Sequence, residues 1–281
     1  MNKIKGIAAA LVAITASQLA SAATTWNAGD LIVGFRSTDG AETNSFEINV
    51  GSVFTIRNGG SFSVNINSQL VSLFGADWFS AGNVYFGAIS SAYSTNTTDT
   101  VAPNGDPGRT TYYTQATSSV GFSGDTADTL APGNRSTINT QILGVINTST
   151  TGSPIDGSFV GQTDLGSNSA SLPNSNTNSW AGKTAGATDF GVFGNPNEMD
   201  SPINGTTTYV DLYRMLNVTT NAVTPANAQI ANTVGTGQFV ATLQITSDGT
   251  LSTSAIPEPA SVAALAGLAA LGLVATRRRR A

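Results

Sequence analysis

Both ends of this chain are apolar segments accompanied by basic residues, and this confines the folding region to the residues between them. One lies within residues 1–22 and the other within residues 256–281 of the 281-residue chain. Because targeting segments do not belong to a domain's fold, we predict a single folded domain over residues 23–255. A domain above ~150 residues buries roughly 70% of its unfolded surface, so this length is sufficient for a core.

The N-terminal segment has the three parts of a secretion signal. Lys3 and Lys5 form a positive region, residues 6–16 are mostly apolar, and the segment ends in Ala20-Ser21-Ala22. The two alanines of this motif suit a signal peptidase, which predicts cleavage before Ala23 and export of the mature chain. A membrane-anchoring helix is the alternative, but the apolar run is too short to span a ~30 Å hydrocarbon core comfortably.

The C-terminal segment also has three parts. Pro257-Glu258-Pro259, within the motif 256–259, precedes an uncharged apolar segment over residues 260–276. A basic cluster follows, formed by Arg277, Arg278, Arg279 and Arg280. As a helix the apolar segment would be roughly 26 Å long, near the lower limit for a transmembrane helix. The positive-inside rule retains the arginines in the cytoplasm and leaves the domain outside, so we predict a transient inner-membrane anchor.

The combination of Pro257-Glu258-Pro259, one apolar helix and a terminal arginine cluster resembles the PEP-CTERM sorting signal of Gram-negative bacteria. The resemblance implies recognition of the tail by an exosortase. It also implies a place in the cell envelope or on the outer surface, and association with extracellular polysaccharide and biofilm. A plain membrane-anchored adhesin, whose tail is an ordinary membrane anchor with a stop-transfer cluster, remains the alternative, although it gives Pro-Glu-Pro no role beyond a turn.

Between the two ends, alternation of polar and apolar residues predicts a mainly β domain. Phe46, Ile48 and Val50, for example, fall on one face of a strand that has polar residues on the other. The expected strands are residues 31–36, 45–50, 62–66, 83–90, 110–116, 207–218, 237–246 and 250–254. Two short helices are expected at residues 68–79 and 136–145. We predict an antiparallel, sandwich-like domain with long polar loops.

Turn signals divide these segments. Asp248-Gly249 between two β-type runs predicts a hairpin, and Asn58-Gly59-Gly60 predicts a turn between the runs that flank it. Residues 147–183 are mostly Ser, Thr, Asn and Gly, and the sequence does not distinguish a long loop system from a spacer there.

Composition excludes several classes of function. Residues 23–255 contain six basic residues against sixteen carboxylates, a charge of about −10, so a basic surface for nucleic acid is absent. The chain has no cysteine and no histidine, which removes disulfides, thiolate metal sites and every nucleophile that depends on histidine. We therefore expect a protein that is not an enzyme and has no resident cofactor.

The remaining candidate residues each have an ordinary structural explanation. Glu42, Glu47 and Glu198 are in no recognised catalytic motif, and alternation predicts that Glu47 is a solvated side chain on the outer face of its strand. Lys183, the single lysine after the signal, lies in a polar segment without a partner serine that would favour catalysis.

Oxygen-rich loops and tryptophans offer two kinds of ligand site. Calcium is an alternative to no cofactor at residues 104–106, 125–128 and 195–200, although Asn and Asp are also common turn residues. Sugar rings stack on tryptophan, so Trp26, Trp78 and Trp180 are candidates for carbohydrate contact, against the more usual role of packing. A carbohydrate-binding or carbohydrate-active protein with the same tail is therefore the alternative function.

Overall fold

The structure is a computed structural model of the chain. It describes residues 24–25, 29–40, 42–92, 106, 110–117, 138, 141–142, 144–145, 154–155, 163–166, 169–184, 199–215 and 237–254. The predicted signal peptide and the predicted sorting tail lie outside these residues, so the predicted helix at 260–276 is not tested. None of the described helices has the length and apolar character needed to cross a membrane.

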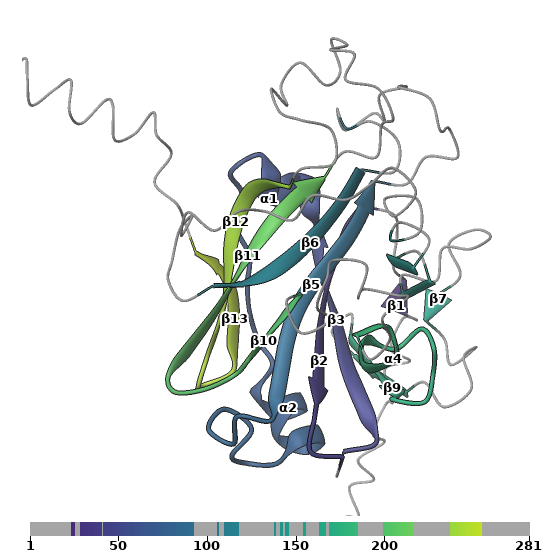
Figure 1. Cartoon of the computed structure of the whole chain (residues 1–281), viewed down its shortest axis with the longest axis vertical. Coiled ribbons are helices and arrows are strands. Elements are labelled where there is room, and N and C mark those ends of the chain that lie inside the picture. The colour runs from purple at the N-terminus through teal and green to yellow at the C-terminus, as the bar shows by residue number, and fades with distance from the viewer. Residues whose placement is uncertain are drawn as a thin grey trace, which may run out of the picture.

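Eleven of the described strands form one large antiparallel sheet, which curls around its core (Figure 1). The order across the sheet is β4-β13-β12-β11-β6-β5-β2-β3-β9-β8, and β10 pairs with β5. The strands are β2 (Asp30–Ser37), β3 (Asn44–Ser52), β4 (Ser63–Asn65), β5 (Val84–Ala92), β6 (Thr110–Thr117), β8 (Thr163–Gly166), β9 (Ser169–Pro173), β10 (Asp200–Pro202), β11 (Thr207–Met215), β12 (Gln238–Thr246) and β13 (Thr250–Ser254). A separate pair joins β1 (Thr24–Thr25) to β7 (Pro154–Ile155).

The prediction of a mainly β, antiparallel domain is confirmed. The predicted hairpin is β12–β13, in which Ile245 pairs with Leu251 and the turn contains Gly249 at φ 78°. The expected sandwich differs from the structure, because hydrogen bonds connect the described strands in one continuous sheet instead of two separate ones.

The curl has a local cause at β5. The first part of β5 pairs with β10, whereas its last residues pair with β6. Thr114 of β6 lies where the two partners diverge: its hydroxyl accepts the Ala88 N–H at 2.7 Å and donates to the Met199 carbonyl at 2.7 Å. A side chain therefore replaces ladder bonds at the branch and lets β6 and β11 turn away from β2 and β3.

The inner face of the curl holds the main core. Phe35, Phe46 and Phe86 pack there with residues of β11, β12 and β13, among them Leu212 and Leu243. Two helices, α1 (Val53–Arg57) and α2 (Asn67–Phe74), contribute to the same cluster and lie at opposite ends of the curl (Figure 1). The opposite, outer face carries a second cluster, which includes Ile32, Ile89, Tyr113 and Trp180.

The helices agree in part with the predictions. The helix expected at residues 68–79 is α2, and residues 138, 141, 142, 144 and 145 are helical within the second expected segment. Helix α1 was not predicted, and it stands directly before the predicted turn at Asn58-Gly59.

The polar segment at residues 147–183 is not simply a spacer. Its last part forms β9, which pairs with β3, and the start of α4 (Trp180–Thr184), which packs against β2 and β3. This packing positions a buried polar site centred on Trp180.

Candidate functional site

A single cross-strand row on the outer face of the sheet brings together residues that are distant in sequence. The row runs over four neighbouring strands in the order Glu47 (β3), Gly34 (β2), Gly87 (β5) and Asp200 (β10). Directly paired residues project to the same face, so two carboxylates flank a pair of glycines. Their backbones are three strand spacings apart, about 14 Å.

Trp180 of α4 fills the gap above the glycines. A Cβ atom on Gly34 would lie 2.1 Å from Trp180 Cδ2, and one on Gly87 would lie 2.9 Å from Trp180 Cζ2. The indole is 0% exposed. Glycine at both positions is therefore a requirement of close approach.

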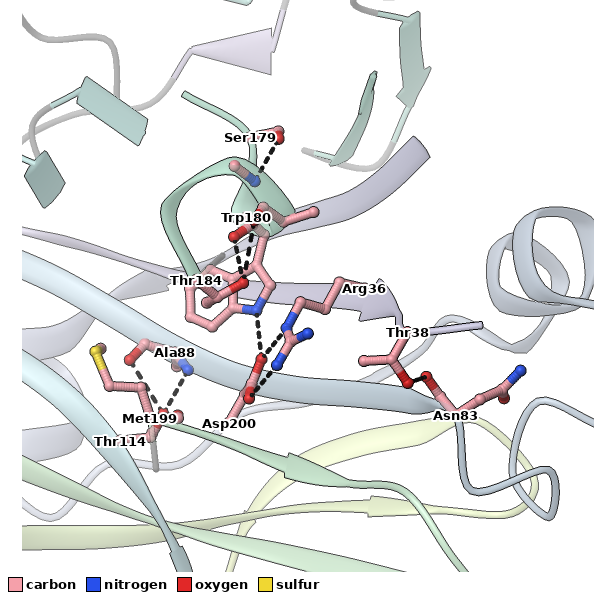
Figure 2. A network of polar contacts seen from close by, with 12 residues as sticks. Arg36, Thr38, Asn83, Ala88, Thr114, Ser179, Trp180, Thr184, Met199 and Asp200 are labelled. Atoms are coloured by element: carbon pink, nitrogen blue, oxygen red, sulfur yellow. Dashed lines mark hydrogen bonds and ion pairs between the residues drawn. The ribbon is translucent and has the colours of Figure 1, made fainter. Parts of the chain in front are cut away.

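Trp180 also bonds to both carboxylates. Its backbone N–H donates to Glu47 Oε1 at 2.6 Å, and its indole Nε1–H donates to Asp200 Oδ2 at 3.3 Å. Figure 2 shows the indole nitrogen directed at Asp200. One residue thus connects the two ends of the row.

Local side-chain bonds hold α4 in place. The Ser179 hydroxyl accepts the Gly182 N–H at 3.0 Å, as a helix N-cap does, and the Thr184 hydroxyl donates to the Trp180 carbonyl at 2.9 Å. Before the helix, the Asn176 side chain accepts the Asn178 N–H at 2.9 Å and forms a turn. The Ser- and Asn-rich composition that resembles a loop therefore provides the caps and turns of a packed segment.

Asp200 forms a buried ion pair with Arg36 on β2. Arg36 Nε donates to Asp200 Oδ2 at 2.6 Å and Nη2 donates to Oδ1 at 3.0 Å, the bidentate geometry preferred by guanidinium and carboxylate (Figure 2). The guanidinium also lies 4.7 Å from the Tyr85 ring centroid. Burial raises the pKa of Asp200, and the Arg36 guanidinium and the Trp180 indole partly offset this effect.

The prediction that Glu47 is solvated is wrong. The residue does point away from Phe46 and Ile48, as the alternation requires, but α4 covers that face and leaves Glu47 0% exposed. Burial raises the pKa of Glu47 to about 8, and the bond from the Trp180 N–H lowers it by a smaller amount. Burial therefore favours the neutral form of this carboxyl at neutral pH.

The buried side chains of this site hold α4 on the sheet and leave a substrate no access. One neutral and one ion-paired carboxyl on the same face resemble an acid–base pair. Glycoside hydrolysis, however, requires room for a sugar between the two groups. Here the Trp180 side chain occupies that space, and Glu47, Trp180 and Asp200 are each 0% exposed.

A second buried cluster surrounds Asp106. Its carboxylate pairs with Arg57 at 2.8 Å and with Arg214, and it accepts the Tyr112 hydroxyl at 2.5 Å. Desolvation, together with the nearby Arg57, lowers the pKa of Arg214 to about 10. This cluster attaches Asp106 to α1 and to strands β6 and β11.

The calcium candidates are placed only in part. Asp106 and Asp200, one from each of two predicted loops, are engaged with arginines. Residues 125–128 lie outside the described part of the chain. Among the described residues, no group of three or more acidic side chains is placed to hold a metal ion.

The other candidates have structural surroundings. Lys183 is 6% exposed and donates to Gln141 Oε1 at 2.6 Å. Trp78 is 1% exposed, and its indole donates to Asn67 Oδ1 at 3.2 Å. Glu42 is partly buried, and both Glu198 and Trp26 lie outside the described residues.

Sequence reasoning missed the row because its members come from four separate segments. No motif contains Gly34, Gly87 and Asp200, and Glu47 hydrogen-bonds to a residue 133 positions away. The available signals were a glycine inside each of two β-type runs, which often marks close approach by another group, and an unusually placed tryptophan in a polar segment.

The comparisons with known proteins match the end of the chain. Residues 255–280 match the family model for the PEP-CTERM protein-sorting motif. No curated protein and no solved structure matches the chain.

The match defines a class of protein first: one that carries a tag for export to the cell envelope or surface. More specifically, residues 255–280 of the chain carry the PEP-CTERM protein-sorting motif. The motif implies an exosortase-type system as its processing partner. The matched residues lie at the end of the chain and do not include Trp180 or its partners.

Proposed function

We propose that this chain is a non-enzymatic surface or matrix protein of a Gram-negative bacterium. A signal peptidase removes residues 1–22, and the helix at residues 260–276 holds the protein transiently in the inner membrane. An exosortase then processes the tail and releases the β domain to an extracellular matrix that contains polysaccharide. The observation that carries this proposal is the match of residues 255–280 to the sorting motif.

The described domain supports a structural role. Charged residues are only 10% of the chain, and several of those described are buried in ion pairs. Val71 is the single large hydrophobic side chain that is exposed among the described residues. A surface of neutral hydroxyls and amides binds water well and suits a hydrated matrix. On this proposal the domain has no resident cofactor.

The alternative is a carbohydrate-active protein with the same tail. It would need accessible carboxylates and an exposed ring for the sugar. Of the described candidates, Trp78, Trp180, Glu47 and Asp200 are all at most 1% exposed. This observation favours the structural role.

The intact mass of the mature protein from native cells tests the sorting proposal. We expect loss of residues 1–22 and of the tail that contains Arg277 to Arg280. Alanine at Pro257, Glu258 and Pro259 should abolish the second loss and leave the first unchanged. Pro225→Ala is the matched control, because it removes a proline outside the motif and should process normally.

Two results would oppose the proposal. A mature chain that keeps the four arginines in wild type is a plain membrane anchor. A chain processed equally well without Pro-Glu-Pro does not use the motif. For the matrix role, the wild-type protein should fractionate with extracellular polysaccharide, and the unprocessed variant should stay with the membranes.

A further inference from the structure

Residues 174–184, called the strap, cross the outer face of the sheet. The strap begins where the Asn174 N–H donates to the Thr43 carbonyl at 2.7 Å. It is anchored at Trp180 through Glu47, at 2.6 Å, and through Asp200, at 3.3 Å. Its last turn is connected to Gln141 by Lys183, at 2.6 Å.

Glu47 is the anchor whose charge matters. It is 0% exposed, and its Oε1 atom accepts the Trp180 N–H. Among the described residues, its Oε2 atom has no hydrogen-bond partner. A neutral carboxyl tolerates this environment, whereas a buried carboxylate with one hydrogen bond pays a large desolvation penalty.

The charged side chains on the elements around Glu47 have other partners. On β2, Arg36 pairs with Asp200, and the carboxylate of Asp30 accepts the Asn49 side chain at 2.7 Å. On the strap, Lys183 points to Gln141. The other elements that pack on β3 contribute Arg57 of α1, which pairs with Asp106, while α2 and β9 carry no ionisable side chain.

We propose that the strap is a pH-sensitive device: it closes over the sheet while Glu47 is neutral, and ionisation of Glu47 releases it. Opening moves the carboxylate into water and breaks the Trp180 anchors and the Lys183–Gln141 bond. It uncovers the indole and the glycine pair beneath it. The strap lies in the exported domain, so its opening does not depend on how the tail is sorted.

The direction and steepness of the response follow from linkage. The pKa of Glu47 is raised to about 8 in the closed state and returns toward its ordinary value of 4.5 once the strap opens. The closed state therefore binds the proton more tightly, and the ratio of open to closed strap rises with pH. The rise is about tenfold per pH unit through neutral pH, and it levels off above about pH 8.

The chain provides its own probe, because Lys183 is the single lysine after residue 22 and is 6% exposed. An endoproteinase that cleaves after lysine reports strap opening as one cut in the mature protein. When closing is faster than cleavage, the cleavage rate follows the open population. We expect the rate for wild type, divided by that for Glu47→Gln, to rise roughly 50-fold between about pH 6 and about pH 8.

Two controls make the result specific. Asp77→Asn removes an exposed carboxylate and should show the wild-type pH response. The wild-type rate is also divided by that of a synthetic peptide with the sequence of residues 178–188, so the test stands even if Glu47→Gln fails to fold. Far-UV circular dichroism is recorded in parallel.

Three outcomes would overturn the inference. One is a normalised cleavage rate that does not change with pH. Another is an identical pH response in a folded Glu47→Gln variant. The third is cleavage that appears only together with loss of the β-sheet signal, because the opening would then be global unfolding and the strap would have no separate motion.

Discussion

The packing of Trp180 on Gly34 leads to a double-mutant prediction. An alanine Cβ at position 34 would lie 2.1, 2.3 and 2.4 Å from three atoms of the indole, far inside contact distance. The ring is 0% exposed and cannot yield without leaving its site. Gly34→Ala should therefore expel Trp180 and lower the free energy of unfolding by the cost of an emptied tryptophan site, ~3–5 kcal/mol.

Trp180→Ala should cost about the same, ~3–5 kcal/mol, because it removes the same ring. The backbone N–H of residue 180 remains, so the bond to Glu47 is retained. In the double variant the alanine at position 34 occupies space that the ring has vacated. Its loss should thus resemble that of Trp180→Ala alone, a coupling of about 3 kcal/mol between two residues in contact.

Urea denaturation of the mature protein at fixed pH, followed by far-UV circular dichroism, measures these differences. Gly40→Ala is the control: nothing lies within 4 Å of its added Cβ, but its φ of 76° is left-handed. It should cost only ~1–2 kcal/mol, and that loss should add to the loss from Trp180→Ala. Additive losses for Gly34→Ala and Trp180→Ala would refute the contact.

Three further predictions use the same measurement. Glu47→Gln should remove a pH dependence of stability, because burial raises the folded-state pKa of Glu47 from 4.5 to about 8. The free energy of unfolding of wild type, relative to that of the variant, should be highest below pH 4.5. It should fall by at most ~5 kcal/mol as pH rises to about 8. Asp200→Asn should cost ~3–5 kcal/mol by leaving Arg36 buried without its carboxylate, whereas the pair Arg36→Met and Asp200→Leu should cost far less. Gly249→Ala should destabilise the β12–β13 hairpin by more than ~1 kcal/mol, because its φ is 78° and its Cβ would lie 2.4 Å from Asn67 Cβ.

The strands could be predicted because their signal is local. In β3, alternation of Phe46 and Ile48 with polar residues identifies both the strand and its inner face. Likewise, Asp248-Gly249 identifies the β12–β13 hairpin without reference to the rest of the chain. Helix α1 was missed because Val53, Thr55 and Ile56 are β-branched residues typical of strands. There the tertiary position, with Val53 and Ile56 buried in the core, prevails over propensity.

The site could not be predicted because it depends on register and coverage. Alternation assigned Glu47 to the outer face, but what covers that face is a segment 133 residues later. The row that includes Gly34 and Asp200 exists only once four strands are paired in the correct register. Two-residue periodicity carries no information about which strands are neighbours.

The buried ion pairs of this charge-poor chain each attach one residue of a separate segment to the sheet. Asp200, at the start of β10, pairs with Arg36 of β2, while Asp106 lies between β5 and β6 in the sequence and pairs with Arg57 and Arg214. Segments with few apolar residues bury little surface, so hydrophobic contact alone fixes them weakly. A bidentate ion pair is directional and fixes one point of such a segment at one place on the sheet. Because these attachments hold single points, losing one should free its own segment first and leave the β11–β12 ladder protected from hydrogen exchange.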